Sequence, residues 1–231
     1  MNNNKMITID GPSGVGKGTL ARKLAKHFNY DLLDSGAIYR LAALHCLNAG
    51  VDVDSIDDVA KHLEIFDIRF EASDSGLVIY LNDQIVTSKI RTEEIGMLTS
   101  KIATYPIVRE MLFKKQKSFA TKKGLVADGR DMGTVVFPNA KFKFFLEASS
   151  EVRAKRRFDE LQAKEQNPDF DIIKADIEKR DYQDRNRKVA PLKPANDALI
   201  VDTSNLSIDE VFDMVVSNIR APLKTLCMQI N

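Results

Sequence analysis

The sequence lacks the residue patterns that define several common classes of protein. Its two cysteines, Cys46 and Cys227, stand far apart, and its three histidines (His27, His45 and His62) form no ligand pair. Neither a disulfide scaffold nor a zinc site is therefore expected, because both need paired residues at short, regular spacings.

Long apolar runs and an excess of charge of one sign are also absent. No segment approaches the length of a membrane span, and the opening residues MNNNK lack the apolar core of a signal peptide. Thirty-four Lys and Arg side chains face 33 Asp and Glu, for a formal net charge of +1. Any basic site must therefore be local. We expect a cytoplasmic monomer that binds neither nucleic acid nor membrane.

The stretch from Met6 to Leu20, MITIDGPSGVGKGTL, reads as a strand, a glycine-rich turn and a helix. Glycines in such a turn let the backbone curl so that amide N–H groups and the positive end of the helix face an anion. Lys17 stands at the spacing of a Walker A loop, from which its ammonium reaches the β- and γ-phosphates of a nucleoside triphosphate. The predicted ATP-binding residues of this loop are Gly11, Pro12, Ser13, Gly14, Val15, Gly16, Lys17, Gly18 and Thr19.

The loop departs from the Walker A pattern at its magnesium ligand. That pattern has Ser or Thr directly after the lysine, whereas here Gly18 takes this place and Thr19 follows. Either Thr19 supplies its hydroxyl from a shifted helix start, or the metal depends on phosphates, water and an acid elsewhere. Asp128 follows an apolar strand that should lie beside the loop strand, as a Walker B acid does. We therefore predict a Mg²⁺ cofactor, with Thr19 and Asp128 as its protein ligands.

Apolar periodicity predicts an alternating β/α chain. Strands are expected near residues 6–9, 30–33, 125–127, 141–146 and 198–201. Helices are expected near 18–28, 37–48, 55–66, 92–123 with a pause at Pro106, 150–163, 172–187 and 207–219. This order fits a parallel sheet covered by helices on both faces. The runs 67–72 and 77–82 alternate with period two around Ser73-Asp74-Ser75-Gly76, and 84–87 can follow as a third strand. They predict an antiparallel insert within residues 60–100.

Arginines matter if the bound phosphates are to react, because phosphoryl transfer requires cations that neutralise charge and exclude water. Six of the thirteen arginines fall between residues 153 and 187, and Arg180, Asp184 and Arg187 share one helical face. The same stretch is rich in Asp and Glu, so a solvated helical surface is the alternative. Asp128, Arg130 and Asp131 stand at the end of a strand, where open α/β sheets bind ligands.

Four runs spread over the chain carry a family resemblance: DGPSGVGKGT at 10–19, LLDSGAIYR at 32–40, ADGRDMGTVVFP at 127–138 and RDYQDRNRKVAPL at 180–192. The chain resembles the nucleoside monophosphate kinases, and among them the bacterial cytidylate kinases. The resemblance implies an α/β, three-layer P-loop fold with a five-stranded parallel sheet, a small antiparallel insert and a helical lid. It implies one kinase domain over residues 1–231, with 60–100 binding the nucleoside monophosphate and 153–190 forming the lid.

The resemblance also assigns roles to residues. It places the CMP phosphate on Arg40, Arg130 and Arg187, the pentose on Ser100, Arg180 and Asp184, and the cytosine on Ser35, Arg109 and Asp131. Gly36 and Tyr39 would line the same CMP-binding pocket, and Arg153 and Arg157 would approach the ATP phosphates. The implied catalytic residues are Lys17, Arg130, Arg187 and Asp128.

These observations predict an ATP- and Mg²⁺-dependent kinase that phosphorylates CMP and dCMP. Two alternatives stay open: a kinase for another small acceptor such as UMP, AMP or shikimate, and a P-loop switch protein that binds GTP. The sequence has no Asn-Lys-x-Asp run to read guanine, and its many arginines favour a transferase.

Overall fold

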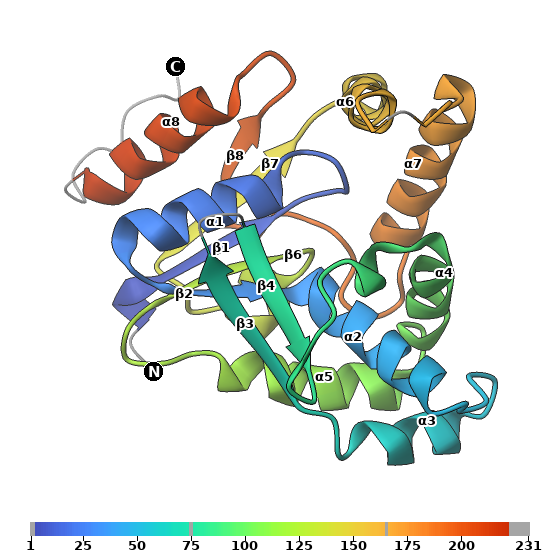
Figure 1. The fold of residues 1–231 in the computed structure, drawn as a ribbon. Coiled ribbons are helices and arrows are strands. Elements are labelled where there is room, and N and C mark those ends of the chain that lie inside the picture. Colours follow the sequence, from blue (N-terminus) through green and yellow to red (C-terminus); the bar gives the residue numbers. More distant parts are fainter. Residues whose placement is uncertain (1–2, 74–75, 165, 222–231) are drawn as a thin grey trace.

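The structure, a computed structural model, describes residues 3–73, 76–164 and 166–221 (Figure 1). Its main sheet has five parallel strands in the order β2-β6-β1-β7-β8. These strands are β1 (Met6–Asp10), β2 (Asp31–Asp34), β6 (Leu125–Gly129), β7 (Phe142–Glu147) and β8 (Leu199–Asp202). The predicted five-stranded parallel sheet is confirmed, with the strand before the glycine-rich loop at its centre.

Helices cover both faces of this sheet, because alternate side chains of each buried strand point to opposite sides. Ile7 and Ile9 of β1 belong to one apolar cluster with residues of α1 (Lys17–Phe28) and α8 (Ile208–Arg220). Met6 belongs to another cluster with residues of α2 (Ser35–Asn48) and α5 (Pro106–Ser118), which lie on the opposite side of the sheet in Figure 1. The three-layer architecture is therefore confirmed.

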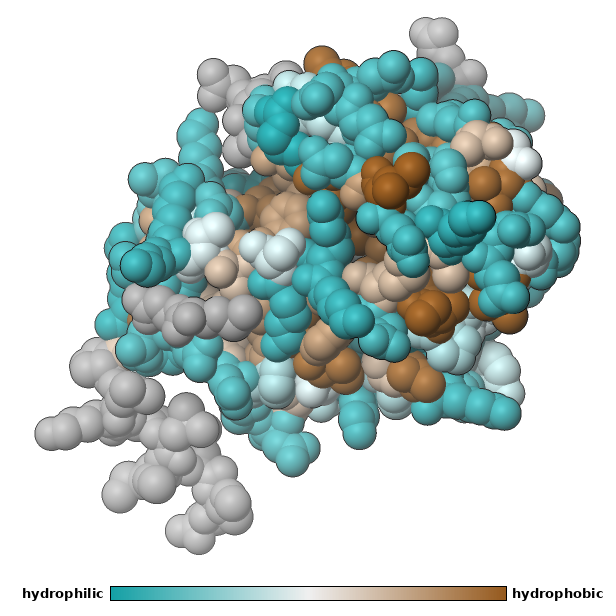
Figure 2. Space-filling view, turned by 90° about the horizontal axis from the view of Figure 1, so that it is seen from below, coloured by the Kyte–Doolittle hydropathy of each residue, from teal (hydrophilic) through white to brown (hydrophobic). Residues whose placement is uncertain are grey.

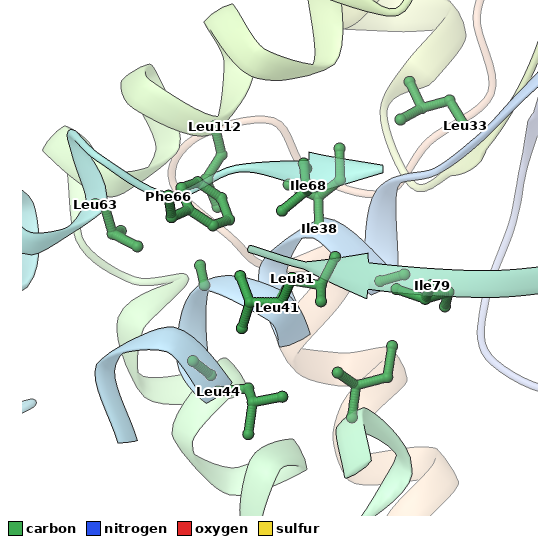
Figure 3. Close-up of a cluster of buried hydrophobic side chains, with 14 of the residues drawn as sticks. Leu33, Ile38, Leu41, Leu44, Leu63, Phe66, Ile68, Ile79, Leu81 and Leu112 are labelled. Carbon is green, nitrogen blue, oxygen red and sulfur yellow. The ribbon is translucent and has the colours of Figure 1, made fainter. Parts of the chain in front are cut away.

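A second, antiparallel sheet lies beside α2. It consists of β3 (Ile68–Ser73), β4 (Gly76–Leu81) and β5 (Gln84–Ile85), and it follows α3 (Ile56–Leu63). Ile68, Ile79 and Leu81 pack with Leu41 of α2 in a shared core (Figure 3). The predicted antiparallel insert is confirmed, although Asp74 and Ser75 of its predicted turn lie outside the described residues.

The helical segment between β5 and β6 is interrupted before Pro106, as the sequence predicts. It contains a short 3₁₀ helix (Lys89–Arg91), α4 (Glu93–Ile102) and α5, which begins at Pro106 and ends at Ser118 rather than near Lys123. The chain then turns through Gly124, whose φ of +121° brings it against the Tyr30 ring. Three short helices of the described chain were not predicted: 3₁₀ helices at Asn3–Lys5 and Lys89–Arg91, and a π-helix at Met132–Val136.

A pair of helices, α6 (Ser150–Gln162) and α7 (Phe170–Arg185), packs away from the sheet on one side of the molecule (Figure 1). Side chains cap both: Ser149 accepts from Val152 N, and Asp169 accepts from Asp171 N and Ile172 N.

Figure 2 shows how polar and apolar residues are distributed over one face of the molecule. The face shown in Figure 2 is mainly hydrophilic, with hydrophobic residues in separate small groups. Among the described residues, no helix is both long and apolar enough to cross a bilayer. Cys46 is buried and unpaired, whereas Cys227 lies outside the described residues.

Candidate active site

The glycine-rich loop leaves the carboxyl end of β1 at the centre of the sheet and crosses closely over β7. Gly11 has a φ of +148°, and a Cβ atom there would lie 2.3 Å from the carbonyl oxygen of Leu146. Only glycine fits such an approach without moving the neighbouring backbone. Helix α1 begins at Lys17, directly after Gly16, so its amino-terminal N–H groups face the loop interior.

The loop opens onto a cavity of about 240 Å³. Its lining residues are Ser13, Gly14, Gly16, Lys17, Gly18, Thr19, Arg22, Asp34, Gly36, Asp128, Gly129 and Arg130. Predicted residues of the ATP loop, of the metal site and of the CMP site thus face one space. Arg22, Asp34 and Gly129 were not predicted, although Asp34 and Gly129 lie within the runs that carry the family resemblance.

Lys17 is the buried cation of this cavity. Its ammonium donates to the carbonyl oxygen of Pro12 at 2.7 Å. Burial, followed by the positive charge of Arg130, lowers the pKa of Lys17 to about 8, and Asp128 opposes this shift. Negative phosphates beside Lys17 would favour the ammonium form and would relieve the cost of its burial.

Asp128 is a buried acid at the end of β6. Burial raises its pKa to about 7, and the nearby Lys17 opposes the shift. Among the described residues, none donates a hydrogen bond to the Asp128 carboxylate or forms a close ion pair with it. A Cβ atom on Gly18 would lie 3.4 Å from Asp128 Oδ2, so the absence of a side chain there leaves the carboxylate open to the cavity.

These residues fit a magnesium ion that takes most of its ligands from nucleotide and water. The described part of the chain has no group of three or more His, Cys, Asp or Glu side chains that could hold a metal by itself. Mg²⁺ typically uses one or two carboxylates and completes its shell with phosphate and water oxygens. Asp128 offers such a carboxylate, and Thr19 lines the same cavity with a hydroxyl that accepts from Arg22 at 3.2 Å.

Asp10 is a second buried acid, to which the sequence analysis assigned no role. Its two carboxylate oxygens accept from the backbone N–H groups of Met132 and Gly133, at 2.8 and 2.7 Å. Burial raises its pKa to about 6 despite these bonds. Asp10 thereby anchors the start of the π-helix, directly after Arg130 and Asp131.

Most of the side chains predicted to hold CMP lie in one group around Arg130 and Asp131. Arg130 Nε donates to Asp184 Oδ2 at 2.7 Å, and Arg187 Nη2 lies 3.6 Å from Asp184 Oδ1. Arg109 Nη2 donates to Asp131 Oδ2 at 3.1 Å, with both side chains largely buried. Thus Asp184 contacts two of the arginines predicted to bind the CMP phosphate, and Asp131 pairs with Arg109, another residue predicted to read the base.

Tyr39 and Arg187 complete this group. The Arg109 guanidinium lies over the Tyr39 ring, 5.8 Å from its centroid. Burial lowers the pKa of Arg187, and its buried Nη2 has no hydrogen-bond partner among the described residues. A buried donor without an acceptor is costly in a folded protein, so an anionic ligand here would satisfy it.

Arg40 lies closer to the antiparallel sheet and α4. Its Nη1 donates to the carbonyl oxygen of Ile90 at 2.9 Å, and burial, followed by the nearby Arg180, lowers its pKa. Ser100 is exposed on α4 and donates to the carbonyl oxygen of Gly96, which lies beside the Arg40 guanidinium. The structure therefore brings Arg40 and Arg180 near each other and leaves Ser100 at the rim.

Ser35 is held by a residue that the sequence analysis missed. Gln116 Nε2 donates to Ser35 Oγ at 2.9 Å, and both side chains are buried. Gln116 lies seven residues after Arg109 on α5, which places both on one face of the helix. That spacing is the only sequence signal that connects Gln116 with the site.

Arg153 and Arg157 are not brought to the cavity wall. Arg153 is only 3% exposed and pairs with Asp181, whereas Arg157 is exposed and pairs with Glu160 at 2.8 Å. Their predicted contact with ATP phosphates stays a prediction.

A phosphate-binding loop at the centre of a parallel sheet, with a buried lysine and several arginines around one cavity, defines a P-loop phosphotransferase. The particular family follows from comparison with known proteins. Residues 7–221 match the cytidylate kinase family, and the chain belongs to it.

Individual relatives agree with this assignment. The chain is 51% identical to the cytidylate kinase of Pasteurella multocida over 223 residues, which cover 96% of this chain and 98% of the relative. It is 50% identical to that of Vibrio cholerae, with 94% of this chain and 97% of the relative covered. A crystal structure of an uncharacterized protein from Eubacterium ventriosum has a similar fold. Its TM-score is 0.50 at 16% identity, and 94% of this chain and 98% of that chain are covered.

Proposed function

We propose that the protein transfers the γ-phosphoryl group of ATP to the 5′-phosphate of CMP, and also of dCMP. The products are ADP and CDP or dCDP. The observation that carries the proposal is that Lys17 of the ATP loop and Arg130 of the CMP set line the same cavity. Two phosphates held by these cations would meet in that space, as in-line transfer requires.

On the donor side, the loop from Gly11 to Thr19 binds the ATP phosphates through its N–H groups and through Lys17. Thr19 and Asp128 would hold Mg²⁺, which when bound neutralises charge on the β- and γ-phosphate oxygens. Lys17 adds a cation that water does not screen, since its side chain is buried. This arrangement stabilises the charge that develops on the transferring group.

On the acceptor side, Arg40, Arg130 and Arg187 bind the CMP phosphate. The attacking oxygen belongs to an ionised phosphate, so no general base is required. Asp184 orients Arg130 and Arg187 in the absence of ligand. We propose that Asp184 also accepts from a pentose hydroxyl, together with Arg180 and the rim residue Ser100.

The cytosine would be read by Ser35, Arg109 and Asp131. Cytosine offers an amino donor next to acceptors at N3 and O2, whereas uracil offers a carbonyl oxygen and an N3–H donor. An ionised Asp131 only accepts and Arg109 only donates, so together they match cytosine. Their 3.1 Å contact is consistent with two adjacent groups that address one edge of the base.

Two parts of the chain would move around this centre. We propose that residues 60–100 form the part that closes over CMP, and that 153–190 form the lid. The Arg157 side chain is exposed on the first lid helix, so on lid closure it is placed to reach the ATP phosphates. A working monomer in the cytoplasm is our further proposal. Size-exclusion chromatography with light scattering tests the monomer.

An ADP-release assay with a panel of acceptors tests the function. CMP and dCMP should give the highest kcat/KM, UMP and AMP much lower values, and shikimate none. Chelation of Mg²⁺ should stop turnover, and excess Mg²⁺ should restore it. A preference for UMP or AMP over CMP would contradict the proposal, and so would GTP hydrolysis without transfer to any acceptor.

A further inference from the structure

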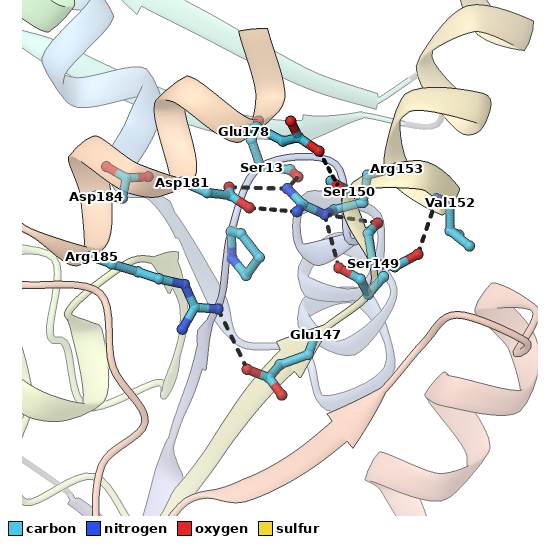
Figure 4. A network of polar contacts seen from close by, with 12 residues as sticks. Ser13, Glu147, Ser149, Ser150, Val152, Arg153, Glu178, Asp181, Asp184 and Arg185 are labelled. Atoms are coloured by element: carbon cyan, nitrogen blue, oxygen red, sulfur yellow. Dashed lines mark hydrogen bonds and ion pairs between the residues drawn. The ribbon is translucent and has the colours of Figure 1, made fainter. Parts of the chain in front are cut away.

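Arg153 of α6 connects three separate parts of the molecule (Figure 4). Its guanidinium forms a two-pronged ion pair with Asp181 of α7, with Nη1–Oδ1 at 3.0 Å and Nη2–Oδ2 at 2.5 Å. Its Nη1 also donates to the carbonyl oxygen of Ser13 in the phosphate-binding loop at 3.1 Å. Its Nε donates to the carbonyl oxygen of Ala148, before α6, at 3.0 Å.

These contacts commit Arg153 to the protein. Protein oxygens accept from each of its three nitrogens, and the side chain is only 3% exposed. Its Cβ atom lies 3.3 Å from the place that a Cβ on Gly14 would occupy, so the arginine packs directly against the loop. In this arrangement Arg153 supports the loop from outside.

The partner helix α7 faces both substrate sites. Asp181 holds Arg153 and, through it, the ATP loop. Asp184, three residues further along α7, holds Arg130 and Arg187 on the CMP side. Residues three apart lie on neighbouring sides of one rigid helix, so the two carboxylates cannot shift independently.

We infer that Arg153 and Asp181 are positioning residues that tie the ATP loop to the CMP-binding arginines through α7, so that each nucleotide strengthens the binding of the other. A nucleotide that orders the loop fixes the Ser13 carbonyl and Arg153, and thereby the position of α7 and of Asp184. Such coupling must be reciprocal, because it is a free energy shared by the two sites. The inference rests on the proposed function, since it requires that ATP and CMP both bind.

Two other links between α6 and α7 provide a matched control. Lys174 pairs with Glu151, and Ser150 Oγ donates to Glu178 Oε1 at 2.9 Å. Both links join the helices at exposed positions, and none of these four residues lines the cavity. Lys174→Gln therefore weakens the helix pair without altering the contact with the loop.

The test measures the CMP dissociation constant by calorimetry, with and without a saturating non-hydrolysable imido analogue of ATP and Mg²⁺. In the wild type, the analogue should tighten CMP binding about fivefold or more, within the usual range for coupled sites. In Asp181→Asn the factor should fall below about twofold, while the affinity for the analogue alone changes less than about threefold. Lys174→Gln should keep the wild-type factor. The reciprocal titration should give the same factor in each protein.

Two further variants separate positioning from general structure. Asp181→Glu keeps the carboxylate and should recover most of the coupling. Arg153→Lys keeps the charge but loses the planar fork, so it should lose the coupling, and it replaces Asp181→Asn in the test if that variant does not fold. Independent binding in the wild type, unchanged coupling in Asp181→Asn, or an equal loss in Lys174→Gln would each overturn the inference. A wild type that binds the analogue but not CMP would overturn the proposed function itself.

Discussion

At the scale of single residues, Lys17 is a buried cation, and its positive charge is unfavourable until a substrate phosphate binds beside it. Its burial lowers its pKa, and its ammonium donates a hydrogen bond to the carbonyl oxygen of Pro12. Lys17→Ala should therefore lower kcat by about 10²-fold or more, because the lost cation acts mainly on transition-state charge. Thermal unfolding without nucleotide should stay within a few degrees of the wild type. Near-normal turnover would contradict the assignment of the phosphate-binding loop.

A substitution at Arg130 separates the effect of the shape of the side chain from the effect of its charge. Arginine holds phosphate with two parallel N–H donors, and lysine acts as a point charge. Arg130→Lys should therefore lower kcat/KM for CMP by at least about tenfold, and the KM for ATP should change little. If the KM for ATP rises and that for CMP does not, Arg130 has been placed on the wrong substrate.

Asp131 is the residue that we propose selects cytosine over uracil. Asp131→Asn introduces an amide that donates to the carbonyl of uracil, so the CMP-over-UMP preference in kcat/KM should narrow roughly 10- to 100-fold, chiefly through a loss for CMP. The alternative is that Asp131 only braces Arg130, although the ion pairs place Arg109 on Asp131 and Asp184 on Arg130. An unchanged ratio would remove Asp131 from the base. Asp159→Asn, an exposed acid on α6, is the control and should leave the ratio unaltered.

At the scale of elements, the junction of β1 and the π-helix connects the ATP loop with the CMP residues. Asp10 closes β1 and accepts from the first two N–H groups of the π-helix. In Asp10→Asn, one of these N–H groups faces an amide donor, and the segment with Arg130 and Asp131 should shift. The KM for CMP should rise about tenfold, and the KM for ATP less than about threefold. An equal rise for both substrates in steady-state kinetics would contradict this role.

The periodicity of apolar residues was sufficient to predict the strands of the main sheet and the helices that cover it. In these elements the apolar side chains are the ones that pack between the sheet and the helices. Periodicity was insufficient where contacts between distant parts of the chain determine the local conformation. The π-helix has no apolar period of its own and depends on Asp10, and α5 stops early because the chain must turn at Gly124. Gln116 and the Arg153–Asp181 pair act through contacts between elements far apart in sequence, which no local pattern reports. The roles of the individual site residues stay predictions.

At the scale of the whole molecule, the buried acids of the site should make the protein less stable as the pH rises. Burial raises the pKa of Asp128 from 3.8 to about 7. Between these values the folded state binds more protons than the unfolded chain, so stability falls with increasing pH. Asp128→Asn removes the cost of the ionised form. Its free energy of unfolding should exceed that of the wild type by about 1–2 kcal/mol near pH 8, and the gap should shrink towards pH 4.

Urea unfolding without nucleotide or Mg²⁺ checks this expectation at several pH values. The wild type is measured in parallel, with Asp159→Asn as the variant of an exposed acid. A gap that is constant with pH, or a variant less stable than the wild type near neutral pH, would contradict the cost assigned to Asp128.

The place of β1 in the sheet has a consequence for how the protein is made. Met6 pairs with Leu125, and Ile7 pairs with Phe142, so the first strand to leave the ribosome must wait for partners more than a hundred residues later. At translation speeds of about 5–20 residues per second, that wait lasts roughly 6–27 s, with apolar strand edges exposed to chaperones or to other chains. The close approach of Gly11 to Leu146 also forms only when β7 arrives. A nascent chain halted before β7 therefore contains every residue of the phosphate-binding loop but lacks the β7 backbone against which Gly11 packs.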